Sequence, residues 1–211
     1  MLVSKVSYPH QGQSMTVGVV LLAAGCSQRF GSDKRHAPFP ESEQVKSSVL
    51  LSTLSQIRAS KLPCFVVLRP GDRSLGLQLN QLNVEWGICP DAHLGMGHSL
   101  AFGVHSTQHW QGWLIALADM PWVLATTYQA LAARLNGENI IRPCVAGSGS
   151  TAKPGNPVAF SQTFAFELMQ CCGDRGARHV IAANPHQIEN LQVNDPGILR
   201  DIDRPTDLPR S

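Results

Sequence analysis

A continuous apolar run that leads directly into a polar, glycine-containing loop constrains this sequence more than any other feature. Residues 16–25 read TVGVVLLAAG, and the loop CSQRFGSDK that follows carries Arg29, Gly31 and Lys34. A strand that is apolar at every position is typical of a parallel sheet covered by helices on both faces. Glycine lets a backbone approach a ligand closely, and the two basic side chains add positive charge. The segment therefore predicts a buried strand that ends at a site for a polyanionic ligand.

Apolar runs alternate with segments of helical period through the first two thirds of the chain. Helices are predicted over residues 43–60, 97–109 and 126–135, the last with Thr126 or Thr127 as its cap. Further buried strands are predicted at residues 63–70, 84–90 and 113–121. Strands that alternate with helices predict an α/β fold, here a doubly wound and mostly parallel sheet.

The pattern changes after residue 140. Short apolar stretches around the loop AGSGSTAKPGNP predict a small antiparallel excursion of the sheet. TFAFELMQCC predicts a helix that ends at Gly173, and ARHVIAAN predicts another short helix. IENLQV and ILRDID predict strand-like pieces. Because no repeat or long linker divides the chain, we expect one domain over residues 16–211, after a flexible tail of residues 1–15.

Composition limits the partners. The 211 residues are 43% hydrophobic and 15% charged, and the net charge is only +2. These values predict a globular protein without a nucleic-acid or membrane partner. No apolar run approaches the ~18 residues of a membrane span, and the N-terminus lacks the apolar core of a secretory signal. The six cysteines form no CxxC pair and indicate reduced thiols of a cytoplasmic protein. We expect a monomer or a weak dimer.

Three polar features fall where a parallel sheet collects ligands, beyond the carboxyl ends of its strands. They are the loop of residues 25–34, Asp119 at the end of a predicted strand, and the pair Asp201 and Asp203. The spacing of two places both members of the pair on one face of an extended segment. A basic loop that faces carboxylates could hold a nucleoside triphosphate with Mg²⁺. Each feature alone could equally be a turn or a helix cap, and the loop is neither a Walker A motif nor GxGxxG.

The order of several short segments resembles a known family. LLAAGCSQRFGSDKR resembles the LAAGxSxRMGxxK signature of sugar- and cofactor-type nucleotidyltransferases, and ADMPWV looks like their DMP segment. GNPVAF, GDRGARHVI and DIDRPTDL are similar to the GHPV, GDxGAR and DIDTPEDL segments of the molybdenum-cofactor cytidylyltransferase, or MobA-like, branch. The resemblance covers residues 16–208 and implies a Rossmann-like fold. It also implies transfer of CMP from CTP to a molybdopterin-type cofactor, with release of pyrophosphate.

The resemblance implies a role for each matching residue. Lys34, Arg29 and Asp119 are the implied catalytic residues, and Asp119, Asp203 and Asp201 are the implied ligands of Mg²⁺. The implied nucleotide-binding residues are Leu22, Ala23, Ala24, Gly25, Ser27, Gly95, Gly97 and Ser99. The implied acceptor-binding residues are Asn156, Asp174 and Arg178. A molybdoenzyme or its chaperone is a further partner that the resemblance allows.

The sequence also departs from the family pattern. Asn156 stands where the family usually has His, and Arg204 where Thr is common. After Lys34, the residues Arg35, His36, Ala37 and Pro38 replace the usual apolar ones. These departures concern the acceptor more than the triphosphate site. Because the sequence does not resolve the base either, three alternatives stay open: a guanylyltransferase, a transferase for another phosphorylated metabolite, and a non-catalytic protein that binds molybdopterin or a nucleotide.

Overall fold

The core of the molecule is a mostly parallel sheet of eight strands. The computed structural model describes residues 16–27, 29–40, 46–147 and 152–209. Across the sheet lie β10 (Ile188–Gln192), β7 (Ile140–Val145), β9 (Val158–Ser161), β6 (Gly112–Leu117), β1 (Val17–Leu22), β4 (Cys64–Leu68) and β5 (Glu85–Ile88). β9 runs antiparallel to both of its neighbours, and β8 (Lys153–Pro154) pairs antiparallel with β7. The predicted parallel α/β fold with a small antiparallel excursion is confirmed.

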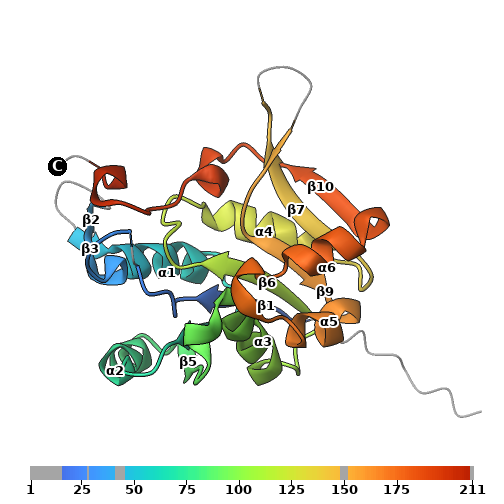
Figure 1. Ribbon diagram of the computed structural model, residues 1–211. Helices are drawn as coiled ribbons and strands as arrows, with labels where there is room; N and C mark the ends of the chain where they lie inside the picture. The colour runs from blue at the N-terminus through green and yellow to red at the C-terminus, as the bar shows by residue number, and fades with distance from the viewer. Residues whose placement is uncertain (1–15, 28, 41–45, 148–151, 210–211) are drawn as a thin grey trace, which may run out of the picture.

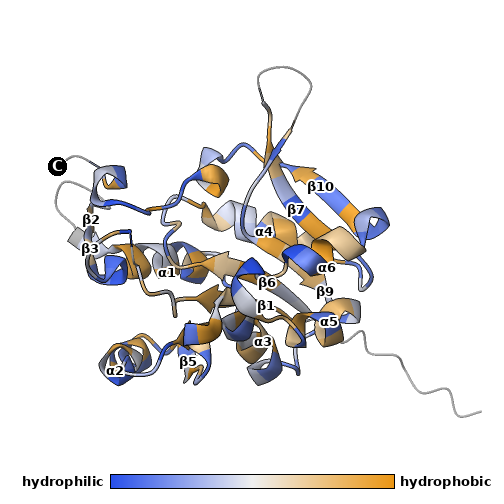
Figure 2. Ribbon diagram, in the orientation of Figure 1, coloured by the Kyte–Doolittle hydropathy of each residue, from blue (hydrophilic) through white to orange (hydrophobic). Residues whose placement is uncertain are grey.

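Helices cover both faces of this sheet (Figure 1). One face packs against α1 (Val49–Ala59), α2 (Arg73–Gln81) and α4 (Ala125–Arg134). The other packs against α3 (Met96–Ser106), α5 (Ala165–Met169) and α6 (Arg178–Ala183). The predicted burial of the first strand is confirmed, because Val19 and Leu21 enter one hydrophobic cluster and Val20 and Leu22 the other. Figure 2 shows hydrophobic residues concentrated on β1 and β6, whereas β10 and α2 carry many hydrophilic ones.

Short elements complete the fold. β2 (Pro38–Pro40) and β3 (Lys46–Ser48) form a separate two-stranded antiparallel sheet. The described residues also contain short 3₁₀ helices, which are η1 (Lys34–His36), η2 (Ala92–Leu94), η3 (Gln162–Phe164), η4 (Gly173–Arg175), η5 (Pro185–Gln187), η6 (Pro196–Leu199) and η7 (Pro205–Asp207). Several of them lie in the segments that form the rim of the candidate site.

In the first two thirds of the chain, the structure corrects three predictions and adds one helix. The helix expected from residue 43 begins at Val49, because β3 precedes it, and residues 41–45 lie outside the described ranges. α2 was not predicted. α3 ends at Ser106, so the expected extension to residue 109 is wrong. Neither threonine caps α4, whose N-cap is Leu124. The carboxylate of Asp195, distant in sequence, accepts the Leu124 N–H instead.

Two predictions near the C-terminus are also wrong. The helix expected to reach Gly173 divides into η3 and α5 and ends at Met169. The segment ILRDID forms no strand, because residues 198 and 199 belong to η6 and residues 200–203 have no regular structure. The predicted strand at IENLQV is confirmed as β10.

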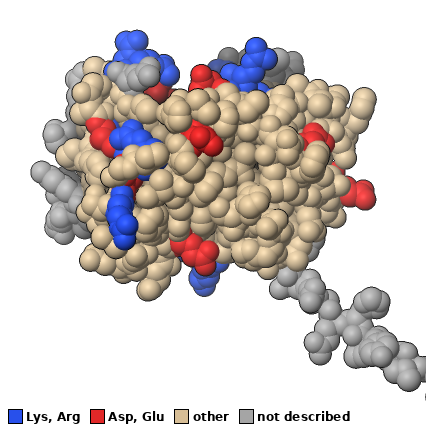
Figure 3. All heavy atoms as spheres, turned by 60° about the horizontal axis from the view of Figure 1, so that its bottom comes forward, with Lys and Arg blue, Asp and Glu red and all other residues tan. Residues whose placement is uncertain are grey.

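Other predictions concern the ends and the surface of the molecule. The predicted tail, residues 1–15, lies outside the described residues. Within the described ranges, every helix is too short or too polar to cross a bilayer. On the face in Figure 3, Lys and Arg are interspersed with Asp and Glu, and the described residues leave most of that surface uncharged.

Candidate active site

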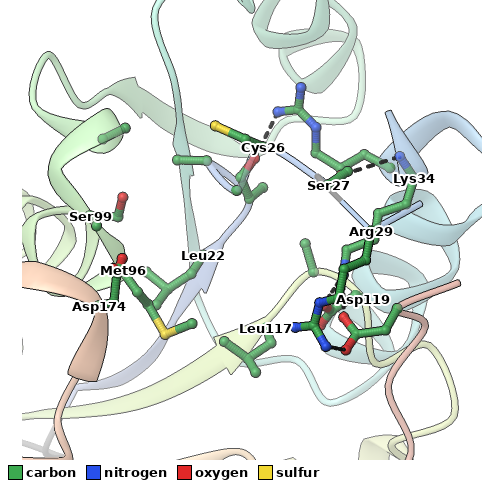
Figure 4. Close-up of a pocket in the computed structure, with 18 of the residues that line it drawn as sticks. Leu22, Cys26, Ser27, Arg29, Lys34, Met96, Ser99, Leu117, Asp119 and Asp174 are labelled. Atoms are coloured by element: carbon green, nitrogen blue, oxygen red, sulfur yellow. Dashed lines mark hydrogen bonds and ion pairs between the residues drawn. The ribbon is translucent and has the colours of Figure 1, made fainter. Parts of the chain in front are cut away.

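A pocket of about 480 Å³ lies at the edge of the sheet where the parallel strands end. The loops after β1, β5 and β6 form its walls, and the C-terminal segment contributes Asp203. In Figure 4, Lys34, Arg29 and Asp119 lie on one side of the pocket, and Ser99, Met96 and Asp174 lie across from them. Of the predicted nucleotide-binding residues, seven line the pocket: Leu22, Ala23, Ala24, Gly25, Ser27, Gly95 and Ser99.

The loop after β1 presents unpaired backbone amides to this pocket. Within the described residues, the N–H groups of residues 24–27 donate to no protein acceptor, whereas that of Ala23 donates to Val67. Ser27 adopts the left-handed conformation (φ 51°), which turns the chain back toward Lys34. The Lys34 N–H then donates to Ser27 Oγ at 3.3 Å. Successive free amides in such a turn form a concave site for an anion.

Lys34 lies against the candidate metal ligands. Its Nζ is 2.6 Å from Asp119 Oδ2 and 3.3 Å from Asp203 Oδ1, and its side chain is only 15% exposed. Burial lowers the pKa of Lys34, but the charges and hydrogen bonds of the two carboxylates outweigh it, and the pKa lies above its ordinary value. The exposed Arg29 pairs with Asp203 at 2.8 Å. The two predicted basic residues thus pair with two of the three predicted carboxylates.

Three carboxylates gather beside Lys34. Each of Asp119, Asp201 and Asp203 offers one oxygen, and these atoms lie within 4.8 Å of one another. Ile202, between the last two, is fully buried, so its neighbours emerge together on the opposite side. Burial and the charges of Asp203 and Asp119 raise the pKa of Asp201. Asp119 Oδ1 is buried and has no partner within the described residues. An all-carboxylate donor set with an unused buried oxygen fits a hard divalent cation.

Glycine is required in the wall opposite the carboxylates. A Cβ on Gly95, whose φ is 122°, would lie 2.4 Å from the carbonyl carbon of Gly173, and one on Gly97 would lie 2.5 Å from Cys172 O. The Gly173 N–H also donates to His98 Nδ1 at 3.3 Å. The segment GMGHS therefore packs directly on residues 172–174. As a result, Gly97 lies behind the pocket wall and does not line the pocket, in contrast to Gly95.

Only one of the three predicted acceptor-binding residues lies in the pocket. Asp174 lines the pocket, whereas Asn156 and Arg178 do not. Asn156 donates its backbone N–H to Ile198 O at 3.0 Å. It precedes β9, whose first residue Val158 lies opposite Ile115 near the carboxyl end of β6. Asn156 therefore lies at the same edge of the sheet as the pocket. Arg178 is an exposed residue at the start of α6.

The pocket also includes residues that the motifs did not single out. His93, Met96 and Cys26 line it, and so does Arg35, which is only 4% exposed. His93 and Met96 lie close in sequence to Gly95, which was a predicted nucleotide-binding residue. The sequence also drew attention to Arg35, because it replaces a residue that is usually apolar in the resembled family. Its structural role became visible only in the fold.

The geometry agrees with the comparison to known proteins. Residues 19–189 match the family model of the MobA-like NTP transferase domain. The chain belongs to this family. The purine catabolism protein PucB of Bacillus subtilis (strain 168) is 29% identical over 197 residues, which span 88% of this chain and 91% of PucB.

Solved structures of other proteins share the fold. Rv0371c from Mycobacterium tuberculosis H37Rv superposes with a TM-score of 0.77 at 23% identity, over 92% of this chain and 95% of that one. A further structure of Rv0371C is a complex with manganese (TM-score 0.69, 20% identity, 85% and 89% covered). The nucleotidyl transferase Mth528 from Methanothermobacter thermautotrophicus superposes with a TM-score of 0.73 at 19% identity, over 91% and 94% of the two chains. The Rossmann-like nucleotidyltransferase fold is thereby established.

Proposed function

We propose that this MobA-like nucleotidyltransferase uses Mg²⁺ to transfer CMP from CTP to the terminal phosphate of a molybdopterin-type cofactor. One observation carries the proposal: at the carboxyl edge of the sheet, Lys34, Asp119, Asp203 and loop amides without an acceptor in the described residues line one pocket, and Asp201 lies beside the two carboxylates. The choice of CTP and of the acceptor rests on the similarity of GNPVAF, GDRGARHVI and DIDRPTDL to the cytidylyltransferase branch.

The proposed reaction joins two anions. An oxygen of the acceptor phosphate attacks the α-phosphorus of CTP, the bond between the α-phosphorus and the bridging oxygen breaks, and pyrophosphate leaves. No proton transfer is needed when the attacking phosphate is already ionised. Charge repulsion between the two anions contributes most to the barrier. Lys34, Arg29 and the loop amides reduce this repulsion. Lys34 is the residue that we assign to the α-phosphate.

Asp119, Asp201 and Asp203 are the residues that would hold the metal ion. A bound Mg²⁺ supplies Lewis-acid stabilisation of charge on the transferring phosphoryl group. Asp119 Oδ1, which is buried and has no partner in the described part of the chain, supports this assignment. The manganese complex of Rv0371C supports a divalent cation in a protein of the same fold.

We assign the acceptor to the side of the pocket that Asp174 lines. Asn156 and Arg178 lie outside the pocket of the free protein, so their assignment requires that the acceptor extend beyond it. Asn156 cannot carry a proton near neutral pH, and its proposed role is to hydrogen-bond the acceptor. The acceptor KM of Asn156→Ala, compared with the CTP KM, tests this assignment.

Pyrophosphate release tests the function. The purified protein is incubated with molybdopterin and CTP, GTP, ATP or UTP, with Mg²⁺ or with EDTA. Pyrophosphate that appears only with CTP, molybdopterin and Mg²⁺ is the expected result. Release with GTP would indicate a guanylyltransferase instead. Calorimetric binding of CTP without any pyrophosphate release would support a non-catalytic accessory protein.

A further inference from the structure

The guanidinium group of Arg35 is buried beneath the loop after β1, and all of its donors are used. Nε donates to Asp33 Oδ1 at 2.8 Å, Nη1 donates to Ala23 O at 2.7 Å, and Nη2 donates to Asp72 Oδ1 at 2.9 Å. The second N–H of each terminal nitrogen donates to the remaining oxygen of Asp72 and of Asp33. Arginine has five N–H donors, so no hydrogen-bonding capacity is left for a ligand.

Arg69 extends this network to a second point of the loop. It follows β4 directly, and its Nη1 donates to Gly25 O at 2.7 Å. Its Nη2 donates to Asp33 Oδ2 at 2.7 Å. Two arginines therefore donate to the carbonyl oxygens of Ala23 and Gly25, and two aspartates hold the arginines in place. We call Arg35, Arg69, Asp33 and Asp72 the loop brace.

Holding these two carbonyls fixes the direction of two amides. In a planar trans peptide, the C=O of one residue and the N–H of the next point in opposite directions. The brace therefore turns the N–H of Ala24 and of Cys26 away from the arginines. Both residues line the pocket, and neither amide has a protein acceptor within the described residues.

The brace also reaches Lys34. The Asp33 side chain accepts the Arg35 backbone N–H at 3.2 Å and thereby caps η1, which begins at Lys34. Burial raises the pKa of Asp33, but the hydrogen bonds and charge of Arg35 outweigh it, and the pKa lies below its ordinary value. Asp33 is therefore ionised at neutral pH. Two cations and two anions cancel, so the brace contributes geometry to the pocket and no net charge.

We infer that the loop brace is a positioning device that presets the loop amides and Lys34 for the phosphates of the nucleotide. The inference rests on the proposed function, since it concerns the same pocket. Arg35 and Arg69 are positioning residues, because their donors face protein oxygens. A preset loop binds its anion without first having to become ordered, so loss of the brace should weaken phosphate binding in protein that is still folded.

Binding of inorganic tripolyphosphate with Mg²⁺, followed by calorimetry, tests the brace without the base or the acceptor. The main variant is Arg69→Met, because Arg69 is partly exposed (25%) and its loss is better tolerated than that of a buried residue. Arg35→Met is the second variant, and Arg73→Met is the matched control. Arg73 is an exposed arginine at the start of α2 with no ion pair within the described residues. Melting temperatures ensure that every titration uses folded protein.

We expect the Kd for tripolyphosphate to rise about tenfold or more in Arg69→Met and in folded Arg35→Met, and to stay unchanged in Arg73→Met. A purely structural network would lower the melting temperature and leave the Kd of the folded protein unchanged, and that result would overturn the inference. If Arg35→Met does not fold, Arg69→Met alone decides. A wild-type protein that binds neither tripolyphosphate nor CTP would overturn the proposed function together with this inference. Tight wild-type binding with equal Kd values in all variants would overturn the brace alone.

Discussion

The backbone N–H of Ile202 donates to the carbonyl oxygen of Asp119 at 2.9 Å. This single bond joins the two segments that supply the candidate metal ligands, one after β6 and one near the C-terminus. The side chain of Ile202 is fully buried in a small cluster with Phe30, Phe39 and Val49. This packing also holds the C-terminal segment next to Asp119. The relative position of the two segments that carry the three carboxylates is therefore set by the fold.

Removal of one carboxylate tests the metal assignment. Asp119→Asn and Asp203→Asn should each weaken the binding of Mg²⁺ or Mn²⁺ at least tenfold, because each removes a charged ligand from a set of three. Asp119→Asn should also lower turnover about a hundredfold or more. Calorimetric Mn²⁺ titration and steady-state kinetics measure the two effects. Glu85→Gln, at the exposed first residue of the edge strand β5, makes the same charge change outside the pocket and should have no effect. Unchanged Mn²⁺ affinity in both aspartate variants would make these carboxylates structural.

Lys34→Ala should lower turnover and stability but raise the affinity for the metal ion. Turnover should fall about a hundredfold or more, because a cation beside the transferring phosphate is lost. The affinity of the nucleotide-free protein for Mn²⁺ should rise, because the ammonium group that neutralises Asp119 and Asp203 is gone. Without metal, the unfolding free energy should fall by roughly 1–3 kcal/mol, because partly buried carboxylates lose their partner. Mn²⁺ titration and urea unfolding with EDTA measure these effects.

The exposed Lys153 provides the control for this variant. Lys153→Ala removes the same charge from β8, outside the pocket, and should change neither turnover nor Mn²⁺ affinity. A Lys34→Ala protein with normal turnover would contradict the assignment of Lys34 to the α-phosphate. Weaker Mn²⁺ binding in that variant would show that Lys34 does not compete with the cation.

Thiol reactivity should separate the cysteines by environment. Cys26 and Cys172 are exposed, whereas burial raises the pKa of Cys64 to about 12 and that of Cys171 to about 11. Because thiolate is the reactive form, less than about one in a hundred of these buried thiols is ionised at pH 8. DTNB (Ellman's reagent) should therefore label two thiols rapidly in the native protein and all six in urea. Cys26→Ser should remove one rapid site.

The position of Cys26 in the pocket adds a ligand test to this experiment. CTP with Mg²⁺ should slow the labelling of Cys26, which lines the pocket, and should leave Cys172 unaffected. Labelling of Cys26 at the same rate with saturating CTP would mean that the triphosphate binds elsewhere. Cys172→Ser, with a single rapid thiol left, makes the comparison direct.

How much the sequence could predict depended on whether a feature was local. The apolar run of β1 and the helical period of α4 come from neighbouring residues, and both were predicted correctly. The spacing of Asp201 and Asp203 likewise placed both in the carboxylate cluster. The role of Thr127 was predicted wrongly because its hydroxyl donates to Asp195, which comes from a distant segment and left no local signal.

The same reason explains what was missed in the site. Arg35 could be recognised as a departure from the family pattern, but its partner Asp72 follows another strand. A pairing between two loops becomes visible only when β1 and β4 lie side by side. The family resemblance assigned Gly97 to the nucleotide-binding residues, whereas its contact with Cys172, which requires a glycine, is a tertiary one.

Asp195 should be one of the most sensitive positions outside the pocket. Its carboxylate is 2% exposed and accepts from the Leu124 N–H at 2.9 Å, from Thr127 Oγ1 at 2.6 Å and from the Gly197 N–H at 2.9 Å. Asp195→Ala removes the acceptor of three donors, two of them buried, which should lower the unfolding free energy by about 2–4 kcal/mol. Asp195→Asn keeps one acceptor oxygen and should cost less.

The effect of Asp195 should extend to the metal ligands, because it fixes the start of the segment that ends at Asp203. A Cβ on Gly197 would lie 2.2 Å from Trp122 O, so η6 rests directly on the loop that begins at Asp119. We therefore expect folded Asp195→Ala to bind Mn²⁺ several-fold more weakly than the wild type. Asp91→Ala, a loss of an exposed aspartate, should change stability by less than about 0.5 kcal/mol. Urea unfolding and Mn²⁺ titration decide between two roles. Lower stability with unchanged Mn²⁺ affinity would limit Asp195 to holding the start of α4 through Leu124 and Thr127, whereas lower stability together with weaker Mn²⁺ binding would mean that it also positions the carboxylates.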